Sequence, residues 1–378
     1  MRYFFLISVL ACGNAFAQYS LTDPQAALHL ATKEWQVYAK VNLLAASDAI
    51  PVRNFESDWS TGYSPKQGRN LFILRNRAEL GMEKDGWQIG MEYRQQGSVD
   101  ASHDTVEFYH LYKQRERPAQ VRDFNINGQF NSWSAAGLRI AHTFSLPGLG
   151  LNANADAPLL MLSGTYYADP RMRDMALQGQ VNYQSNDVYS VKAQSQESNT
   201  RYQYPFMPDV AQTGSGASVS LALQWPLSEQ LSAYVALNDL WSRMHWSNLP
   251  AVQKQLNSDV TSYDQDGYVN YRPLLTGQNS QMSKQRSIGA SATASLTYRF
   301  GVWSVHSALD YLEGTYIPQI SASYHSRWGS FSGSYESRFR TVGVGYDYGP
   351  LRLHLRSNRW DINQASALGL DASLHYHF

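Results

Sequence analysis

Apolar and polar residues alternate strictly along several stretches of this 378-residue chain. In the most regular stretch, seven apolar or aromatic side chains occupy every second position from Ile288 to Phe300. Small and polar residues fill the positions between them, and the stretch ends with two aromatics, Tyr298 and Phe300. A period of two indicates a β-strand with one apolar and one polar face. The pattern therefore predicts an extended strand here.

The same alternation recurs along the chain, near 87–94, 175–183, 218–225 and 351–356, and less regularly near 35–46, 103–114 and 158–168. Each stretch has about the ten residues that a tilted membrane strand needs. Turn-forming segments, such as Lys84-Asp85-Gly86, Ser185-Asn186-Asp187 and Gly349-Pro350, alternate with longer connections near 47–69, 199–213, 244–283 and 358–366. This rhythm predicts an all-β fold, an antiparallel up-and-down transmembrane β-barrel of about 18 strands, with 16 as the alternative. Counted back from Phe378, the short turns are expected in the periplasm. The exception is the longish connection from Leu146 to Pro158, which falls on the same side.

The chain ends on a segment, 368–378, in which every even position is apolar or aromatic. It resembles the C-terminal strand of bacterial outer-membrane barrels and, at class level, of porins. The resemblance implies that Leu374, Tyr376 and Phe378 form an assembly signal for the barrel assembly machinery. It also implies outer-membrane lipid outside the barrel and water inside it.

The N-terminus reads as a secretory signal peptide over residues 1–17. Arg2 gives the positive region, and Ala15-Phe16-Ala17 gives the cleavage site. The apolar run is far shorter than the ~20 residues of a membrane-spanning helix. A lipoprotein modified at Cys12 is the alternative. We expect a short periplasmic segment over 18–33, a barrel over 34–378 and a location in the bacterial outer membrane.

Composition excludes several classes of function. Cys12 is the only cysteine, so the mature chain would have no disulfide and no thiolate metal site. The formal net charge is zero, which gives no electrostatic case for nucleic acid. No cofactor is predicted, and the oligomeric state is left open. A soluble β-sandwich or propeller is the competing fold, but no blade repeat is visible.

The alternation assigns charged side chains to the interior, because an Arg or Lys facing lipid would cost about 2–4 kcal/mol at mid-membrane. We predict a pore-lining basic ladder of Lys40, Arg75, Arg77, Arg338, Arg340, Arg352 and Arg356. Guanidinium groups hold carboxylates and phosphates in two-pronged contacts, so such a ladder would guide anions. The alternative is a structural network that pairs these cations with Glu79, Glu336 and Asp371.

The longest connection, 244–283, is predicted to fold into the lumen as a constriction loop. Its candidate residues are Trp246, Asp259, Tyr263, Asp264, Asp266, Tyr268 and Tyr271. The segment Asp264-Gln265-Asp266-Gly267 is faintly similar to a calcium loop but lacks the later ligands. A surface turn is the simpler interpretation, and no metal site is predicted.

No catalytic residues are predicted, because the chain contains neither a G-x-S-x-G nor an H-E-x-x-H motif. His306, His354, His375 and His377 gather towards the C-terminus, so a barrel hydrolase stays as a second alternative. The predicted function is a porin-like channel for passive passage of small hydrophilic solutes, anions among them. The first alternative is a non-conducting barrel that acts as a surface or adhesion scaffold, or as a component of an export or pilus-type assembly.

Overall fold

The computed structural model describes residues 34–56, 59–147, 157–185, 188–203, 212–258, 261–263, 269–271 and 274–377. They form one antiparallel sheet of 16 strands and a separate two-stranded hairpin. The strands of the large sheet are β1 (Gln36–Ser47), β2 (Arg69–Lys84), β3 (Trp87–Ser102), β4 (Arg122–Ser145), β5 (Leu159–Ser185), β6 (Val188–Asn199), β7 (Thr213–Pro226), β8 (Leu231–Asn257), β11 (Leu275–Arg286), β12 (Ser291–Phe300), β13 (Trp303–Leu312), β14 (Thr315–Ser326), β15 (Gly329–Glu336), β16 (Thr341–Tyr348), β17 (Leu351–Ser357) and β18 (Ala367–His377). The hairpin comprises β9 (Thr261–Tyr263) and β10 (Val269–Tyr271), and the helical segments are α1 (His103–Gln114), η1 (Val52–Glu56) and η3 (Ile362–Gln364). Within these ranges, no helix has both the length and the apolar character needed to cross a membrane.

The sheet closes into a barrel where β18 pairs with β1, from Gln36 opposite His377 to Ala46 opposite Ala367. Around the ring the order is β1–β5, then β7, β8 and β12–β18. Because β6 and β11 lie outside this ring, the wall has 14 strands. The antiparallel barrel is confirmed, but the predicted count of about 18 strands is not. The alternative count of 16 equals the number of strands in the large sheet, but only 14 of those strands close the ring.

Part of the excess in the predicted count comes from one long strand. The chain regions near 158–168 and 175–183, predicted as two strands, are both part of β5, which runs for 27 residues. Asp169 has a left-handed φ of 41° at the join. Before it β5 pairs with β7, and after it with β6. Ser185 therefore lies at the end of the sheet opposite the C-terminus, and the prediction of a periplasmic turn there is wrong.

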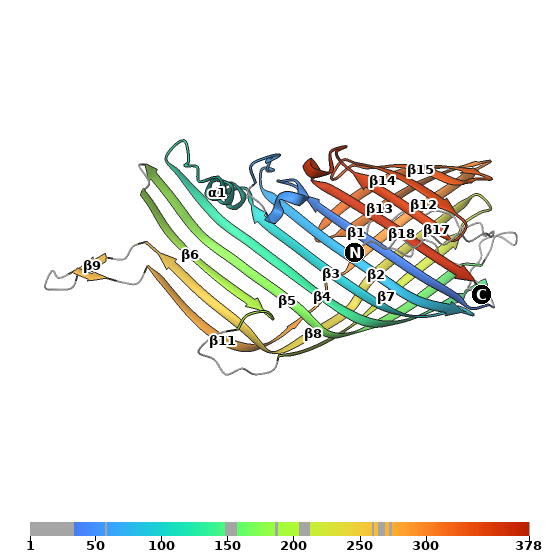
Figure 1. Cartoon of the computed structure of the whole chain (residues 1–378), viewed down its shortest axis with the longest axis horizontal. Helices are drawn as coiled ribbons and strands as arrows, with labels where there is room; N and C mark the ends of the chain where they lie inside the picture. The colour runs from blue at the N-terminus through green and yellow to red at the C-terminus, as the bar shows by residue number, and fades with distance from the viewer. Residues whose placement is uncertain are drawn as a thin grey trace, which may run out of the picture.

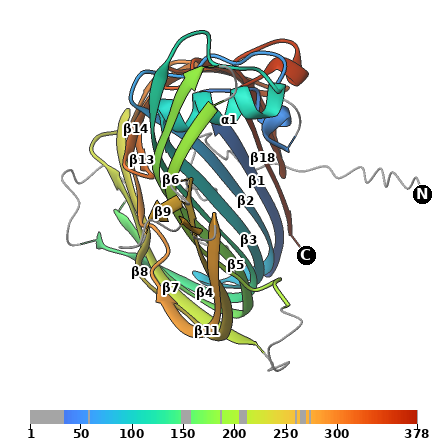
Figure 2. The same ribbon diagram turned by 90° about the vertical axis from the view of Figure 1, so that its left-hand side faces the viewer.

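The wall is much taller on one side than on the other. The strands β4, β5 and β8 have 24, 27 and 27 residues, whereas β15, β16 and β17 have 8, 8 and 7. The outer halves of the three long strands continue past the ring with β6 and β11, and we call this projecting sheet the extension. Figure 1 shows it on the left, at the end of the molecule away from the C-terminus, and Figure 2 looks at the molecule from that side. We take that end as extracellular, since both termini of such a barrel lie in the periplasm.

The region near 103–114, predicted as a weak strand, is the helix α1 instead. Its N-terminus is capped by Ser102, whose hydroxyl accepts a hydrogen bond from the Thr105 N–H. It ends at Arg115, which is in the left-handed conformation. Val106, on one face of the helix, is buried against the extracellular ends of the strands. The helix pattern was missed because its polar residues are interspersed among aromatics.

The two faces of the wall differ as the alternation predicted. On β3, Trp87, Ile89 and Met91 point outward and are about half exposed or more, while Gln88 and Glu92 point inward and are buried. Exposed large apolar side chains recur in this way around the ring. A soluble protein rarely exposes so much contiguous apolar surface. The chain is a membrane-spanning β-barrel of the outer-membrane class, as the sequence predicted.

Candidate functional site

The middle of the lumen is crossed by an ion pair between Arg94 on β3 and Asp239 on β8. The two guanidinium nitrogens of Arg94 lie 2.8 and 2.6 Å from the two carboxylate oxygens of Asp239. The strands are four places apart around the ring, so the pair spans a chord of the barrel. Asp239 can reach inward because β8 kinks there: its φ is 54°, and its N–H donates to Ser220 Oγ at 2.9 Å.

Further ion pairs surround this one, and we call the set the ion-pair layer: Arg75, Arg77, Glu79, Glu92, Arg94, Arg139 and Asp239. Arg77 lies 2.5 Å from Glu92, and Arg139 lies 3.1 Å from Glu79. Nearly all of these side chains are buried. Buried charges are stable only when they are paired, and every charge of this layer has an opposite charge within 4 Å.

Two tyrosines complete the layer. Tyr38 donates to Glu79 at 2.6 Å, and Tyr167 donates to Glu92 at 2.8 Å. The ring of Tyr38 lies flat against the wall at Gly81, where a Cβ would stand 2.6 Å from the phenol oxygen. Only glycine leaves room for this approach. The tyrosines therefore hold the two glutamates in position for the arginines.

Arg75 reaches almost to the opposite wall. Its guanidinium donates to Ser291 Oγ on β12 at 3.2 Å, and it lies 3.7 Å from Glu313, in the turn after β13. β2 and β12 are six places apart in one direction around the ring and eight in the other. The barrel is therefore bridged across its full width by polar contacts.

A small polar pocket adjoins the ion-pair layer on its periplasmic side. Its lining includes Arg77, Arg139 and Asn238, together with hydroxyls of Ser163 and Thr165. Arg77 Nε, Arg139 Nε and Asn238 Nδ2 are buried without a hydrogen-bond partner in the structure. Such donors cost about 1–3 kcal/mol each unless water meets them. The pocket is therefore suited to an ordered water.

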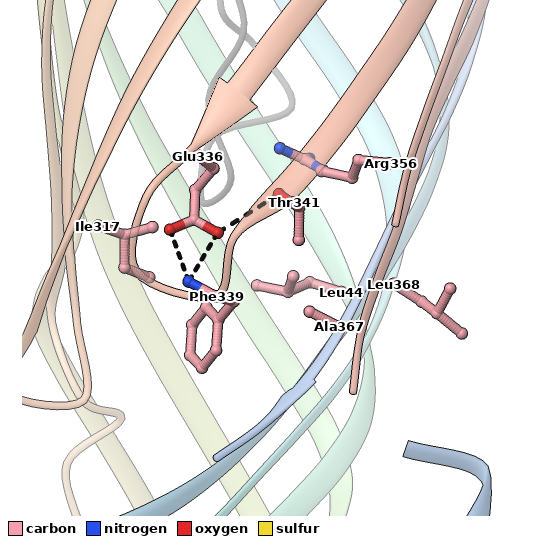
Figure 3. A pocket seen from close by; sticks show the side chains of 8 residues that line it. All are labelled: Leu44, Ile317, Glu336, Phe339, Thr341, Arg356, Ala367 and Leu368. Carbon is pink, nitrogen blue, oxygen red and sulfur yellow. Dashed lines mark hydrogen bonds between the residues drawn. The ribbon is translucent and has the colours of Figure 1, made fainter. Parts of the chain in front are cut away.

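Nearer the extracellular end, an apolar cluster bridges the lumen, and we call it the outer plug. Its members are Leu44, Ala46, Leu71, Ile73, Leu312, Ile317, Phe339 and Ala367. Ile73 on β2 and Leu312 on β13 come from strands seven places apart, on opposite sides of the ring. Phe339 belongs to the turn 337–340 between β15 and β16, and Figure 3 shows its ring pointing into the barrel beside Leu44 and Ala367.

The turn that carries Phe339 is held at both ends. Glu336 accepts hydrogen bonds from the Phe339 N–H at 3.0 and 3.1 Å and from Thr341 Oγ1 at 3.3 Å (Figure 3). Arg340 has a left-handed φ of 59°, which costs a non-glycine residue about 1–2 kcal/mol. A small, mostly apolar pocket lies beside Phe339. The turn is thus a strained element that borders the outer plug.

An ion pair fastens this turn to the segment just after β1, three places round the ring from β16, and we call it the latch. Arg338 donates to the two oxygens of Asp48 at 2.7 and 2.8 Å. Lys66 Nζ and the Leu71 N–H also donate to Asp48, at 2.7 and 3.1 Å. Burial alone would raise the pKa of the Asp48 carboxyl, but the hydrogen bonds from Arg338, Lys66 and Leu71 outweigh it and lower that pKa below its ordinary value. The hydrogen bond to Asp48 likewise raises the pKa of Arg338.

The residues of the predicted basic ladder lie in different places. Lys40, Arg75 and Arg77 lie inside the barrel, the last two in the ion-pair layer. Arg352 points inward, 3.4 Å from Asp347, and Arg356 lies over Gly369. Arg338 and Arg340 are in the turn 337–340 rather than on a strand, and Arg340 is exposed. Conduction along these residues stays a prediction.

The predicted constriction loop is not one loop. Residues 244–257 belong to β8, and residues 275–286 form β11. Trp246 is a buried strand residue whose indole N–H donates to the Pro170 carbonyl at 2.6 Å. Tyr263 and Tyr271 lie in β9 and β10, which Figure 1 places at the far end of the extension. Asp259, Asp264, Asp266 and Tyr268 lie outside the described residues, as do residues 1–33 and Phe378.

Two of the histidines that kept the hydrolase alternative open, His306 and His354, bond to neighbouring strands. Thr297 Oγ1 lies 3.0 Å from His306 Nδ1, and His354 Nε2 lies 2.8 Å from Asp347. These pairs satisfy buried polar groups of the wall. Within the described ranges, no group of three or more His, Cys, Asp or Glu side chains is arranged to hold a metal ion.

At the C-terminal strand, Leu374 and Tyr376 point outward, opposite Ala39 and Val37 of β1. Their role in assembly stays a prediction. Sequence reasoning missed Asp48, Asp239 and Phe339, which lie in or beside irregular backbone where alternation gives no inward or outward assignment. The signal available for Asp239 was a lone acid within an apolar stretch, Leu237 to Trp241.

No family model matches the chain, and no curated protein matches it. Among solved structures, the TodX deltaS2S3 mutant monoaromatic hydrocarbon channel is 10% identical over 94% of this chain and 93% of that chain, with a TM-score of 0.41. The P. putida toluene transporter TodX is 9% identical over 90% and 88%, with a TM-score of 0.38. The Escherichia coli outer membrane protease OmpT is 10% identical over 94% and 100%, with a TM-score of 0.23. At this level of likeness, none of them assigns a substrate or an activity to this chain.

Proposed function

We propose that the chain is a gated channel of the bacterial outer membrane for small hydrophilic solutes, anions among them, shut here at its extracellular mouth. The observation that carries the proposal is the position of Phe339. It completes the outer plug from a short strained turn rather than from a strand. A side chain on a turn can leave the lumen without breaking the wall.

The character of the lumen supports a hydrophilic solute. The ion-pair layer and the pocket beneath it present guanidinium, amide and hydroxyl groups, not an apolar track. Arg94 also has a second carboxylate nearby, since its Nε lies 3.6 Å from Glu92. Arg77 likewise lies near both Glu92 and Glu79, at 2.5 and 3.5 Å. If the Arg94–Asp239 pair separated, Arg94 would therefore still have Glu92 nearby, and Arg77 would keep both of its glutamates.

A non-conducting surface scaffold is the second candidate, favoured by the dense packing of the interior and by the extension. The two candidates differ in solute flux. In liposome swelling, the channel account expects slow entry of a small sugar and of a small organic anion with the wild-type barrel. It expects faster entry with Arg338→Gln, which removes the latch.

Arg173→Gln is the matched control. Arg173 forms an exposed ion pair with Glu197 on the extension, at 2.8 Å, far from the mouth. This variant should match the wild type. If Arg338→Gln, shown to be folded, admits no more solute than the wild type and Arg173→Gln, the scaffold account is the better one.

A further inference from the structure

The extension has two long edges, and one of them is covered. On β4, Asn125 and Asn127 lie beyond the last pairing with β3. The first turn of α1 takes up their backbone groups. The Asn125 N–H donates to Asp104 at 2.9 Å and the Asn127 N–H to Thr105 Oγ1 at 2.7 Å. Ser102 and Thr105 hydroxyls donate to the carbonyls of Asn125 and Asn127, both at 3.0 Å. At Asn125 and Asn127 this edge is therefore shielded from another strand.

The other edge, on β11, is open. β11 pairs with β8 on one side, and no described strand pairs with its other side. All six residues from Leu275 to Ser280 are exposed. Natural sheets usually shield such an edge with a helix, a proline or inward charges, as the β4 edge is shielded here. The segment 275–280 contains neither a proline nor a charged residue.

The pairing with β8 shows which backbone groups point away from the sheet. The Asn257 N–H donates to the Leu274 carbonyl at 2.9 Å. In antiparallel pairing, hydrogen-bonded positions alternate with positions whose N–H and C=O point outward. The outward positions along the exposed half of β11 are therefore Leu275, Gly277 and Asn279. They form a row of donors and acceptors about 13 Å long, at about 3.3 Å per residue.

We propose that the open edge of β11 is a docking site for an extended segment of another protein, which adds to the extension as a further strand. Strand addition of this kind takes its affinity from main-chain hydrogen bonds. The segment would be polar and uncharged to match 275–280. The nearby cations do not select an acidic partner, because Lys284 and Arg286 both already contact Asp174, at 2.9 and 2.7 Å.

A second copy in the same membrane does not fit this edge. Two barrels inserted in the same direction are related by a rotation about the membrane normal. Such a rotation keeps each strand pointing the same way relative to the membrane. It also brings the tilted β11 edges together at twice their tilt, so that they cross. A continuous ladder between two β11 strands is therefore excluded, and the occupant must be a different chain.

The test uses the full-length barrel in nanodiscs and a fluorescent peptide with the uncharged sequence of residues 275–283 as the probe. A free peptide is not held in one orientation by the membrane, so it can pair antiparallel with β11. We expect saturable binding, with slower amide hydrogen exchange at Leu275, Gly277 and Asn279. Asn279→Pro removes one outward N–H without touching the bonds to β8. It should weaken binding at least tenfold, whereas Asn279→Ala should change it less than twofold.

Three results would overturn the proposal. One is no binding, and a second is equal binding to the folded Asn279→Pro variant. The third is slow exchange at the outward amides before any peptide is added, which would mean that a segment of this chain already covers the edge. None of these results depends on whether the barrel conducts.

Discussion

The outer plug and the ion-pair layer both bridge opposite sides of the barrel, but they are built differently. The plug is apolar, and its central side chain, Phe339, sits on a turn fastened by one ion pair. The layer is charged, and all of its members belong to wall strands. Paired charges fixed on strands hold the cross-section of the barrel, whereas a side chain on a turn can move. Under the proposed function, the layer serves stability and the plug serves gating.

Removal of one charge of the layer is expected to have the largest effect and tests whether the layer serves stability alone. Arg94→Ala would leave Asp239 buried without its main partner, which typically costs about 3–5 kcal/mol. We expect a loss of that size in urea unfolding followed by tryptophan fluorescence, with solute flux unchanged because the plug is intact. Replacing both partners, as in Arg94→Met with Asp239→Leu, should restore part of the stability. An increase in flux in the folded single variant would contradict the division of roles.

Phe339→Ala tests the other half of the comparison. It removes a buried ring from the outer plug and should cost about 2 kcal/mol, in line with the burial of one large apolar side chain. Its main effect should be on conductance, because no other group on the turn reaches the cluster. We expect at least a tenfold rise in open probability in planar bilayers. Phe339→Leu, which keeps most of the apolar volume, is the control and should stay near the wild type.

Asp48→Asn weakens the latch without emptying the plug. A charge-assisted hydrogen bond contributes about 1.5–3 kcal/mol, part of which the amide retains. We expect the ratio of open to closed channel to rise about tenfold, the equivalent of about 1.4 kcal/mol. Lys66→Ala removes only the exposed partner of Asp48 and should have a smaller effect. Equal effects of the two variants would show that Arg338 is not the main partner.

The latch also predicts a dependence on pH. The pKa of Asp48 in the closed state is below its ordinary value of about 3.9, so the carboxylate stabilises the closed state at neutral pH. That contribution is fully present above the ordinary value and is lost as the pH falls through the lowered one. Open probability should therefore be flat from pH 7 to 5 and rise below about pH 4. Asp48→Asn should abolish this rise.

The smallest effect is expected on the extension. Arg173→Gln breaks an exposed ion pair, and such pairs contribute about 0–1 kcal/mol. Unfolding and conductance should both stay within error of the wild type. A large change in gating would mean that the extension acts on the mouth. That result would contradict the assignment of gating to the outer plug alone.

The sequence predicted the barrel well where lipid acts on every second residue. On β3 and β12, alternation fixed both the strand and its inward face. It failed along β5 and β8, because their outer halves leave the membrane and carry polar residues on both faces. The outer half of β5 was therefore predicted as a separate strand, and that of β8 as part of a loop. It also failed at α1, where a capped helix was interpreted as a weak strand.

The candidate site was only partly predictable for a related reason. Arg75 and Arg77 were assigned to the interior because the alternation of inward and outward positions along the strand requires it. Their partners across the lumen depend on closure of the ring and on the kink at Asp239, which no local pattern encodes. Phe339 was missed because a single aromatic residue in a turn has no periodicity. Arg338 was predicted as a ladder residue, but the structure pairs it with Asp48 from the other end of the chain.

Single-channel recording of the wild type beside Phe339→Ala, in the same bilayer and at neutral pH, tests the central claim most directly. The account predicts rare openings for the wild type and long or permanent openings for the variant. Both should have the same unit conductance, because the ion-pair layer limits each. If the variant, with its barrel intact, is as silent as the wild type, the outer plug is not a gate, and the account is contradicted.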